Sequence, residues 1–449
     1  MDRKHRILFA VPALFGHLHP SLAIARHLLA QGHAVGYCSG SGAKKIVGSY
    51  GINDFYPRDV YQTAMDKMAQ AKGIYENWYT VARQCSTRVI HQIFVELIDA
   101  FEAFQPDVVY VDSIDFFAAA VADKYNLPFA HGSATTLFYF EKDIPPLGTG
   151  WDINKLWLNR FRFIPYVMGT VPFMLKIYFN QLKAMKSIDV NWKTTNLSGI
   201  SPYLFMLFST DKFEYPRKLF IPSMFYVGPS ILEPDEKQLL DFPWEKLDDA
   251  KPLIYIATGT VFPEIYFEFY KKIMKALSEL LFPIQVQVVM AIGRGQSVEA
   301  LGNIPKNFIV VNYAPQVKLM EKASVVVTHG GVNSVNEALS FGKPMLVVYL
   351  GRDLIEMAQR VVHNGAGIRL DPRKATVRSI RKKIIQLLKN PKYTRSAEGV
   401  MHSFNKCGGE KTAAALIERL AETKRPILRK KESPITLENM NDLAQFLDD

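Results

Sequence analysis

Cysteine is scarce in this chain, which has three among 449 residues: Cys38, Cys85 and Cys407. Because their number is odd and their spacing wide, the sequence predicts neither a disulfide framework nor a zinc site. A reducing compartment suits such a chain, so the predicted location is the cytoplasm. Residues 1–11 also lack the long apolar core and small-residue cleavage site of a secretory signal, and we therefore expect no export.

Long apolar runs are missing as well. In the middle of the chain the longest uncharged stretch, residues 164–175, contains two prolines and one glycine. It is much shorter than the roughly 20 residues that a transmembrane helix requires. The composition of 48% hydrophobic and 22% charged residues is typical of a globular protein with large cores. With 449 residues the chain exceeds one compact core, and we expect at least two domains.

Negative charge is the scarcer sign, which leaves a formal net charge of +11. Such an excess is found in proteins that bind nucleic acids, anionic membranes or acidic substrates. The Lys and Arg residues are spread along the whole chain, whereas nucleic-acid-binding proteins gather them on one face or stripe. Nucleic acid is therefore not an expected partner.

Strand patterns alternate with helical patterns in both halves of the chain. In the first half we predict strands at 6–11, 34–38 and 107–112, and a helix at 20–31 that Pro20 begins. The second half has comparable strands separated by helix-length gaps, at 253–257, 286–292, 308–312, 324–328 and 345–350. This alternation predicts an α/β protein with two facing Rossmann-like domains, each on a parallel sheet, and a cleft between them.

A stretch rich in acidic residues, prolines and loop signals, residues 228–252, is the predicted linker. We therefore expect a first domain at 1–228, with a helical insertion at about 140–190, and a second at 229–425. Beyond it, a basic run and two prolines precede a helical pattern, so residues 426–449 are predicted to form a tail or a return helix.

Residues 324–353 contain the most informative motif. A β-branched run without alternation predicts a buried parallel strand, and Gly330 and Gly331 then permit tight backbone geometry and close approach of a ligand. A helix is predicted to follow, capped by Asn333 or Ser334 and closed by Gly342 in the left-handed conformation. Free N–H groups and the helix dipole favour a phosphate at the His329 end, which predicts a nucleotide diphosphate site. An ordinary strand-turn-helix unit is the alternative.

A histidine and a carboxylate follow two strands of the first half. His17 comes after the strand at 6–11, and Asp112 ends the strand at 107–112. Because the carboxyl ends of parallel strands meet at one edge of a sheet, both side chains are expected to face the cleft. Such a pair can act as a general base that its partner holds in one tautomer, although capping and turn roles are commoner. His19 is the competing candidate, for which we expect a turn role.

Four segments, residues 12–33, 108–113, 254–261 and 313–339, together resemble the family 1 glycosyltransferases with the GT-B fold, in particular the bacterial macrolide-type branch. The similarity extends over about residues 6–418. It implies the inverting transfer of a sugar from a nucleotide diphosphate donor to a hydroxyl of a small acceptor. It implies neither a cofactor nor a metal ion, since the donor, linked to UDP or TDP, is a co-substrate.

Residue by residue, the resemblance implies that His17 is the base and Asp112 its partner. Tyr313 stands where the family stacks an aromatic ring, usually Trp, on the nucleotide base, which leaves uridine and thymidine both open. Glu337 is implied to accept the two ribose hydroxyls, for which a carboxylate is well suited. The other implied donor contacts, to the nucleoside, the diphosphate or the sugar, are Thr260, Gln316, His329, Gly331, Asn333, Ser334 and Asp353.

The chain departs from the family after Asp353, where Leu354 replaces the usual glutamine. Loss of that amide favours a sugar with fewer or differently placed hydroxyls, such as a deoxysugar or an amino sugar, while glucose stays an option. Two alternatives to transfer remain open: a catalytically silent homologue that binds nucleotide sugars, and a nucleotide-sugar epimerase.

Aromatic and basic side chains alternate along residues 151–186. This segment is expected either to cover a pocket for a hydrophobic acceptor, to make a peripheral membrane contact, or to pack its aromatic rings into its own domain. A polyketide, terpenoid, sterol, carotenoid or flavonoid would suit such a pocket. The sequence indicates no oligomeric state.

Overall fold

The computed structural model describes most of the chain, including both predicted sheets. The described residues are 4–70, 86–134, 141, 143–146, 148–155, 175–176, 179–180, 182–187, 200–233, 241–259, 263–278, 284–293, 296–350, 353–430 and 436. Thr260, Cys85 and most of the aromatic segment 151–186 lie outside them, as do the side chain of Asp353 and the helical pattern predicted after residue 436. Among the described helices, none is long and apolar enough to cross a bilayer.

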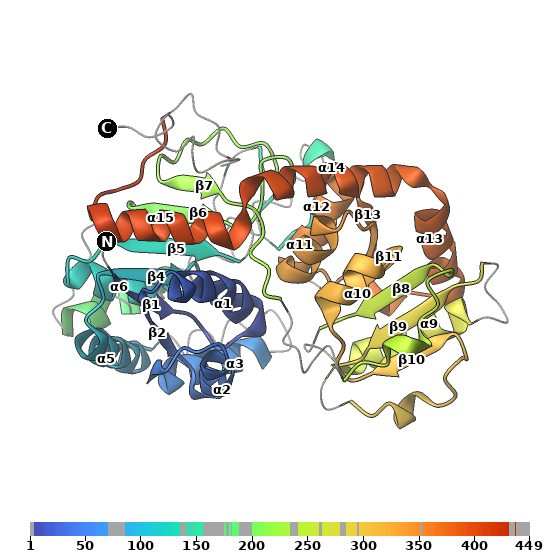
Figure 1. Cartoon of the computed structure of the whole chain (residues 1–449), viewed down its shortest axis with the longest axis horizontal. Coiled ribbons are helices and arrows are strands. Elements are labelled where there is room, and N and C mark those ends of the chain that lie inside the picture. The colour runs from blue at the N-terminus through green and yellow to red at the C-terminus, as the bar shows by residue number, and fades with distance from the viewer. Residues whose placement is uncertain are drawn as a thin grey trace.

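The N-terminal lobe is built on a seven-stranded parallel sheet in the order β3-β2-β1-β4-β5-β6-β7 (Figure 1). Its strands are β1 (Arg6–Ala10), β2 (Ala34–Ser39), β3 (Asp54–Pro57), β4 (Val108–Asp112), β5 (Phe129–Ser133), β6 (Leu204–Leu207) and β7 (Met224–Tyr226). The helices that follow them are α1 (Phe15–Ala30), α2 (Lys44–Ser49), α3 (Asp59–Gln70), α5 (Thr87–Phe104) and α6 (Phe116–Lys124). Every residue of β4 is buried, as its unbroken apolar run predicts.

The C-terminal lobe has a six-stranded parallel sheet in the order β10-β9-β8-β11-β12-β13. Its strands are β8 (Leu253–Ala257), β9 (Gln287–Ala291), β10 (Phe308–Val311), β11 (Val325–Thr328), β12 (Met345–Val348) and β13 (Gly367–Leu370). Its helices are α9 (Pro263–Leu277), α10 (Gln316–Lys322), α11 (Val332–Ser340), α12 (Asp353–His363), α13 (Val377–Lys389) and α14 (Pro391–Cys407). All five predicted strands of this half are present, and the predicted fold class is confirmed.

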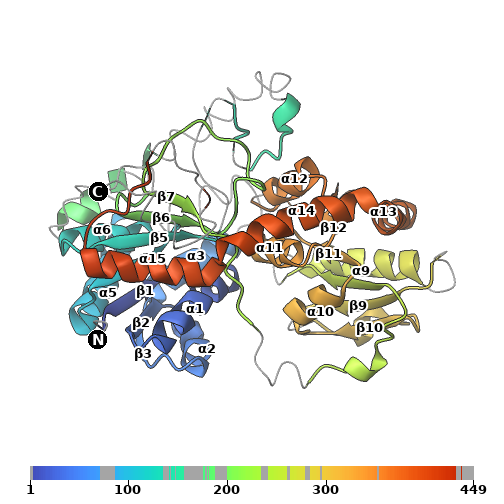
Figure 2. The same cartoon turned by 45° about the horizontal axis from the view of Figure 1, so that its top comes forward.

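The chain crosses between the lobes at the linker and again between α14 and α15 (Gly409–Thr423), as Figures 1 and 2 show. The two crossing segments contact each other, since the Gly409 amide donates to the Val227 carbonyl at 2.9 Å. Helix α15 then buries Leu416, Ile417 and Leu420 in the core that α1 forms with the N-terminal sheet. The domain limits stay a prediction. Helix α15 lies within the range predicted for the second domain, but it packs on the first lobe.

Beyond α15 the chain returns along the edge of the N-terminal sheet. The Ile427 amide donates to the Tyr203 carbonyl and the Arg429 amide to the Pro222 carbonyl, both at 2.8 Å. Thr436 then forms a parallel bridge with Tyr226 of β7. Such pairing covers an edge strand that otherwise exposes unpaired backbone groups.

Helix α1 begins earlier than predicted. It starts at Phe15, so the expectation that Pro20 begins it is wrong. Proline lacks an N–H and usually begins a helix, but here Pro20 lies in the second turn, where the helix loses one bond. The acceptor of that missing bond is the carbonyl of Gly16, four residues earlier. His17 consequently lies in the first turn of a helix and not in the loop before it.

Candidate active site

His17 and Asp112 meet at the carboxyl edge of the N-terminal sheet. Their strands β1 and β4 are neighbours, and His17 Nδ1 lies 2.9 Å from Asp112 Oδ2. The other carboxylate oxygen accepts a hydrogen bond from the Ile114 amide at 3.0 Å. Asp112 is 1% exposed and the His17 side chain 14%. When Nδ1 donates its proton to this fixed carboxylate, Nε2 is the basic nitrogen of the ring.

His19 has a different environment on the same helix. Its ring lies edge-on to Phe15, with 5.4 Å between the ring centroids, and burial lowers its pKa. His17 is therefore the histidine that the structure pairs with Asp112.

A buried ion pair lies below this edge. Arg58 and Asp115 pair through guanidinium and carboxylate, and both side chains are 0% exposed. Asp115 also caps α6 by accepting from the Ala118 amide, and its own amide donates to the Asp112 carbonyl. The pair thus neutralises one carboxylate and anchors the loop that follows Asp112.

The predicted diphosphate motif has the expected backbone course but different caps. Gly330 has a φ of +92°, which favours glycine, and α11 begins at Val332. The N-cap is Gly331, and in the described part of the chain no side chain caps the helix. The predicted capping by Asn333 or Ser334 is wrong, because both lie inside the first turn. Gly342 follows the helix with a φ of +64°, as predicted.

His329 fills the space beside two glycines at the start of α11. A Cβ atom on Gly259 would lie 2.9 Å from its ring, and one on Gly331 2.6 Å. Its Nδ1 is buried without a hydrogen-bond partner among the described residues. Burial lowers the pKa of His329 to about 4, while a hydrogen bond to the Ala257 backbone opposes that shift. His329 is therefore neutral near pH 7 and can offer a phosphate a hydrogen bond but no positive charge.

The residues predicted around the nucleoside gather between α10 and α11. Gln316 Nε2 donates to Ser334 Oγ at 3.3 Å and to the Glu337 carboxylate, and its Oε1 accepts from the Tyr255 hydroxyl at 3.3 Å. Tyr313, between β10 and α10, is 46% exposed, as a ring that stacks on a nucleotide base must be.

Asn333 contacts the opposite lobe. Its Nδ2 donates to the Gly16 carbonyl at 2.9 Å, and this is the carbonyl that Pro20 cannot use within α1. The start of α11 is thereby fixed one residue from His17. Because this side chain is implied to bind the diphosphate, donor binding would have to compete with this contact.

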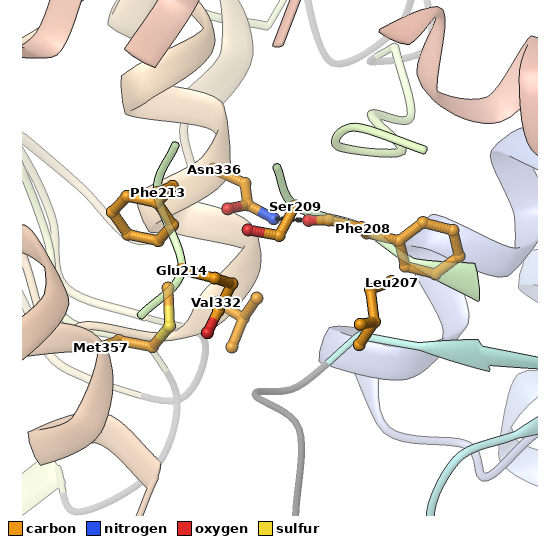
Figure 3. Close-up of a pocket in the computed structure, with 8 residues that line it drawn as sticks. All are labelled: Leu207, Phe208, Ser209, Phe213, Glu214, Val332, Asn336 and Met357. Atoms are coloured by element: carbon orange, nitrogen blue, oxygen red, sulfur yellow. Dashed lines mark hydrogen bonds between the residues drawn. The ribbon is translucent and has the colours of Figure 1, made fainter. Parts of the chain in front are cut away.

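A second cross-lobe region was not predicted from the sequence. A small cavity there, drawn in Figure 3, is lined by Leu207, Phe208, Ser209, Phe213, Glu214, Val332, Asn336 and Met357. Asn336 Nδ2 donates to the Phe208 carbonyl at 2.8 Å across it. Asparagine on the buried face of a helix was the available sequence signal, since buried amides need partners.

Glu337 is expected to make donor binding dependent on pH. Burial raises its pKa to about 7, against the effect of the Gln316 hydrogen bond. To accept the two ribose hydroxyls that the resemblance assigns to it, Glu337 must be ionised, so binding of an intact nucleotide sugar should weaken about tenfold from pH 8 to pH 6. Calorimetric titration checks this, since the phosphates of such a donor do not titrate in that range. Glu337→Gln should bind more weakly with a flat profile, and an equally steep profile in that variant would contradict the assignment.

Residues 273–406 match the erythromycin biosynthesis protein CIII-like C-terminal domain. The chain is 25% identical over 420 residues to the NDP-glycosyltransferase YjiC of Bacillus subtilis (strain 168), covering 93% of this chain and 97% of YjiC. It is 25% identical over 432 residues to the 4'-demethylrebeccamycin synthase of Lentzea aerocolonigenes, covering 92% of this chain and 99% of the synthase.

Solved structures agree in fold. The glycotransferase of kitacinnamycin superposes with a TM-score of 0.72 at 22% identity, covering 93% of this chain and 99% of that one. The calicheamicin glycosyltransferase CalG4 gives a TM-score of 0.71 at 20% identity, covering 94% of this chain and 100% of that one. The two facing sheets are thus the GT-B architecture.

These findings define the class of the protein as a glycosyltransferase with the GT-B fold. The match to the CIII-like domain and the relatives confirm the resemblance to bacterial macrolide-type transferases that was found in the sequence. The relative YjiC is named an NDP-glycosyltransferase, and the glycosyltransferase VinC, of similar fold, was solved in complex with DTDP.

Proposed function

We propose that this protein is an inverting, metal-independent glycosyltransferase that moves a sugar from a UDP- or TDP-linked donor to a hydroxyl of a small hydrophobic acceptor. The observation that carries the proposal is the 2.9 Å contact between His17 and Asp112. A second contact of 2.9 Å, from Asn333 to the Gly16 carbonyl, sets this pair beside the donor helix α11. In a single displacement the acceptor oxygen and the leaving diphosphate lie on opposite faces of the anomeric carbon. A base on one lobe and a donor site on the other suit that arrangement.

In the proposed reaction, His17 Nε2 takes the proton of the acceptor hydroxyl as its oxygen attacks the anomeric carbon. The bond from that carbon to the phosphate oxygen breaks, and its electron pair leaves with the nucleoside diphosphate. Because attack and departure occur on opposite faces, the configuration inverts. The Asp112 carboxylate stabilises the imidazolium that forms.

The departing diphosphate would be stabilised by the start of α11. Its first N–H groups and helix dipole favour negative charge, and neutral His329 adds a hydrogen bond. Donors fixed before the reaction need no reorganisation while charge develops, and they would supply here what a divalent ion supplies elsewhere. Thr260, proposed as a further hydroxyl donor, lies outside the described residues.

A hydrophobic acceptor is supported by apolar surface at the same edge of the sheet. Phe15, in the first turn of α1, is 49% exposed, and Phe116, at the start of α6, is 39% exposed. Relatives named 4'-demethylrebeccamycin synthase and zeaxanthin glucosyltransferase, the latter from Pantoea ananas and 24% identical over 433 residues, also favour such acceptors. A peripheral membrane contact through residues 151–186 stays a prediction.

A panel of UDP- and TDP-linked sugars, incubated with aromatic and polycyclic alcohols, tests the proposal. Mass spectrometry should detect a glycosylated acceptor, and NMR should show an anomeric configuration opposite to that of the donor. Turnover that persists in a chelator would support independence from metal ions. Nucleotide binding without turnover of any donor would indicate a silent homologue, and epimerised donor without acceptor would indicate an epimerase.

We expect Leu354 to influence which donor sugar the protein prefers. It is half-buried in the first turn of α12, directly after Asp353, where the family has an amide. Leu354→Gln should raise kcat/KM for a glucose donor about two- to tenfold relative to a deoxysugar donor, the usual weight of one neutral hydrogen bond. Steady-state kinetics with both donors measures this ratio. Leu354→Met, of similar size and without an amide, is the control, and an equal ratio in both variants would remove Leu354 from the role.

A further inference from the structure

Three charged side chains are buried where α12 meets the N-terminal lobe. Arg360 and Glu356 are each 2% exposed, and Glu214, from the segment after β6, is 8% exposed. Arg360 Nε lies 2.9 Å from Glu214 Oε2, and its Nη1 lies 3.4 Å from Glu356 Oε2. The guanidinium also lies 4.5 Å from the ring centroid of Tyr215. One cation of the C-terminal lobe is thus held between two carboxylates, one from each lobe.

The same network holds the backbone of Gly150, a residue of the N-terminal lobe. Glu356 Oε1 accepts a hydrogen bond from the Gly150 amide at 2.7 Å, and Arg369 Nη1 donates to the Gly150 carbonyl at 2.9 Å. Gly150 has a φ of +57°, and a Cβ atom there would lie 2.3 Å from Ile355 Cγ1. Only glycine fits this position without displacing α12. The residues Gly150, Glu214, Glu356, Arg360 and Arg369 are called the clasp below.

The clasp acts on the first turn of α12. This helix begins at Asp353, so Ile355 and Glu356 belong to the turn that carries the proposed sugar contact. Gly150 precedes Trp151, the first residue of the aromatic segment proposed to cover the acceptor. Glu214 and Met357 both line the adjoining cavity (Figure 3). The clasp therefore links the segment before the proposed acceptor cover to the turn beside the donor sugar.

We propose that the clasp is a positioning device for the donor sugar, an inference that rests on the proposed transferase function. A buried ion network adds little net stability compared with well-packed apolar residues, because each charge must give up its water. Its contribution here is geometric: two charged side chains fix the amide and the carbonyl of Gly150, and the Gly150 contact sets the distance between α12 and the opposite lobe. The sugar at Asp353 is thereby held against the acceptor side of the cleft.

Two variants of the full chain test this role. Arg369→Met keeps the aliphatic stem but removes the bond to Gly150, and Gly150→Ala pushes the loop away from Ile355. Both should lower kcat/KM for the nucleotide sugar about tenfold or more, the usual weight of a charge-assisted hydrogen bond. The Kd of the free nucleoside diphosphate should stay within about twofold of wild type, since its proposed contacts at Tyr313, Gln316 and Glu337 do not involve α12. Titration calorimetry and steady-state kinetics give the two quantities.

Asn364→Ala is the matched control. Asn364 follows α12 at its far end, and its Nδ2 donates to the Phe213 carbonyl of the opposite lobe at 2.9 Å. This variant should lower thermal stability without changing the ratio of kcat/KM to nucleotide affinity. If the clasp variants also left that ratio unchanged, or weakened nucleotide binding equally, the positioning role would be refuted. Absence of turnover in the wild-type protein would overturn the proposed function, and the clasp with it.

Discussion

Replacing His17 by alanine should lower the rate of sugar transfer by about two to four orders of magnitude, the usual weight of general acid-base catalysis. The imidazole is oriented by a carboxylate that is itself 1% exposed and fixed by a backbone amide, so the substitution removes the base that this carboxylate positions. Donor affinity should stay unchanged, because the proposed nucleotide contacts lie on the other lobe. Transfer assays with saturating donor, together with calorimetric titration of the nucleotide, separate the two quantities.

His19→Ala is the matched control, since this histidine lies on the same helix and contacts Phe15 edge-on, while His17 is the histidine paired with Asp112. It should retain most of the activity. Asp112→Asn should lose activity nearly as His17→Ala does, because an amide cannot stabilise the imidazolium as a carboxylate does. Full activity in His17→Ala, or a larger loss in His19→Ala, would reassign the base.

Uninterrupted β-branched runs made the parallel sheets predictable, since strands covered on both faces need no polar alternation. The run Val325–Val327 is an example, buried throughout β11. Strand β13, with the sequence GIRL, is short and carries a charged residue, so its pattern does not separate it from a loop. Helix boundaries were less predictable. Pro20 indicated a helix start, but a cross-lobe contact to Gly16 satisfies the carbonyl that an internal proline leaves unpaired.

The contact between His17 and Asp112 could be predicted because topology alone brings the ends of neighbouring parallel strands together. The grouping of Gln316, Ser334 and Glu337 came from the family resemblance, and the structure does bring these side chains together. The clasp had no sequence signal. Gly150 and Glu356 are 206 residues apart and belong to different lobes, and neither periodicity nor spacing relates positions that only the docking of two lobes brings together.

Removing the guanidinium of Arg58 should cost about 3–5 kcal/mol of unfolding free energy, the usual result of leaving one partner of a buried ion pair unpaired. Arg58 and Asp115 are both 0% exposed, and the guanidinium also lies 4.2 Å from the ring centroid of Tyr61. Arg58→Met keeps much of the side-chain volume, so the loss measures the uncompensated Asp115 charge more than a cavity. Urea unfolding followed by tryptophan fluorescence gives the difference.

The double variant Arg58→Met, Asp115→Asn distinguishes charge from packing. Asparagine can still cap α6 through its side-chain oxygen, and with both charges gone most of the lost stability should return, so the two substitutions should not be additive. If the double variant were as unstable as Arg58→Met, the loss of unfolding free energy would come from packing around Tyr61. The Asp115 amide donates to the Asp112 carbonyl, so transfer activity should fall in Arg58→Met and recover in the double variant, as the stability does. The ion pair would then support the carboxylate that orients His17 as well as the fold.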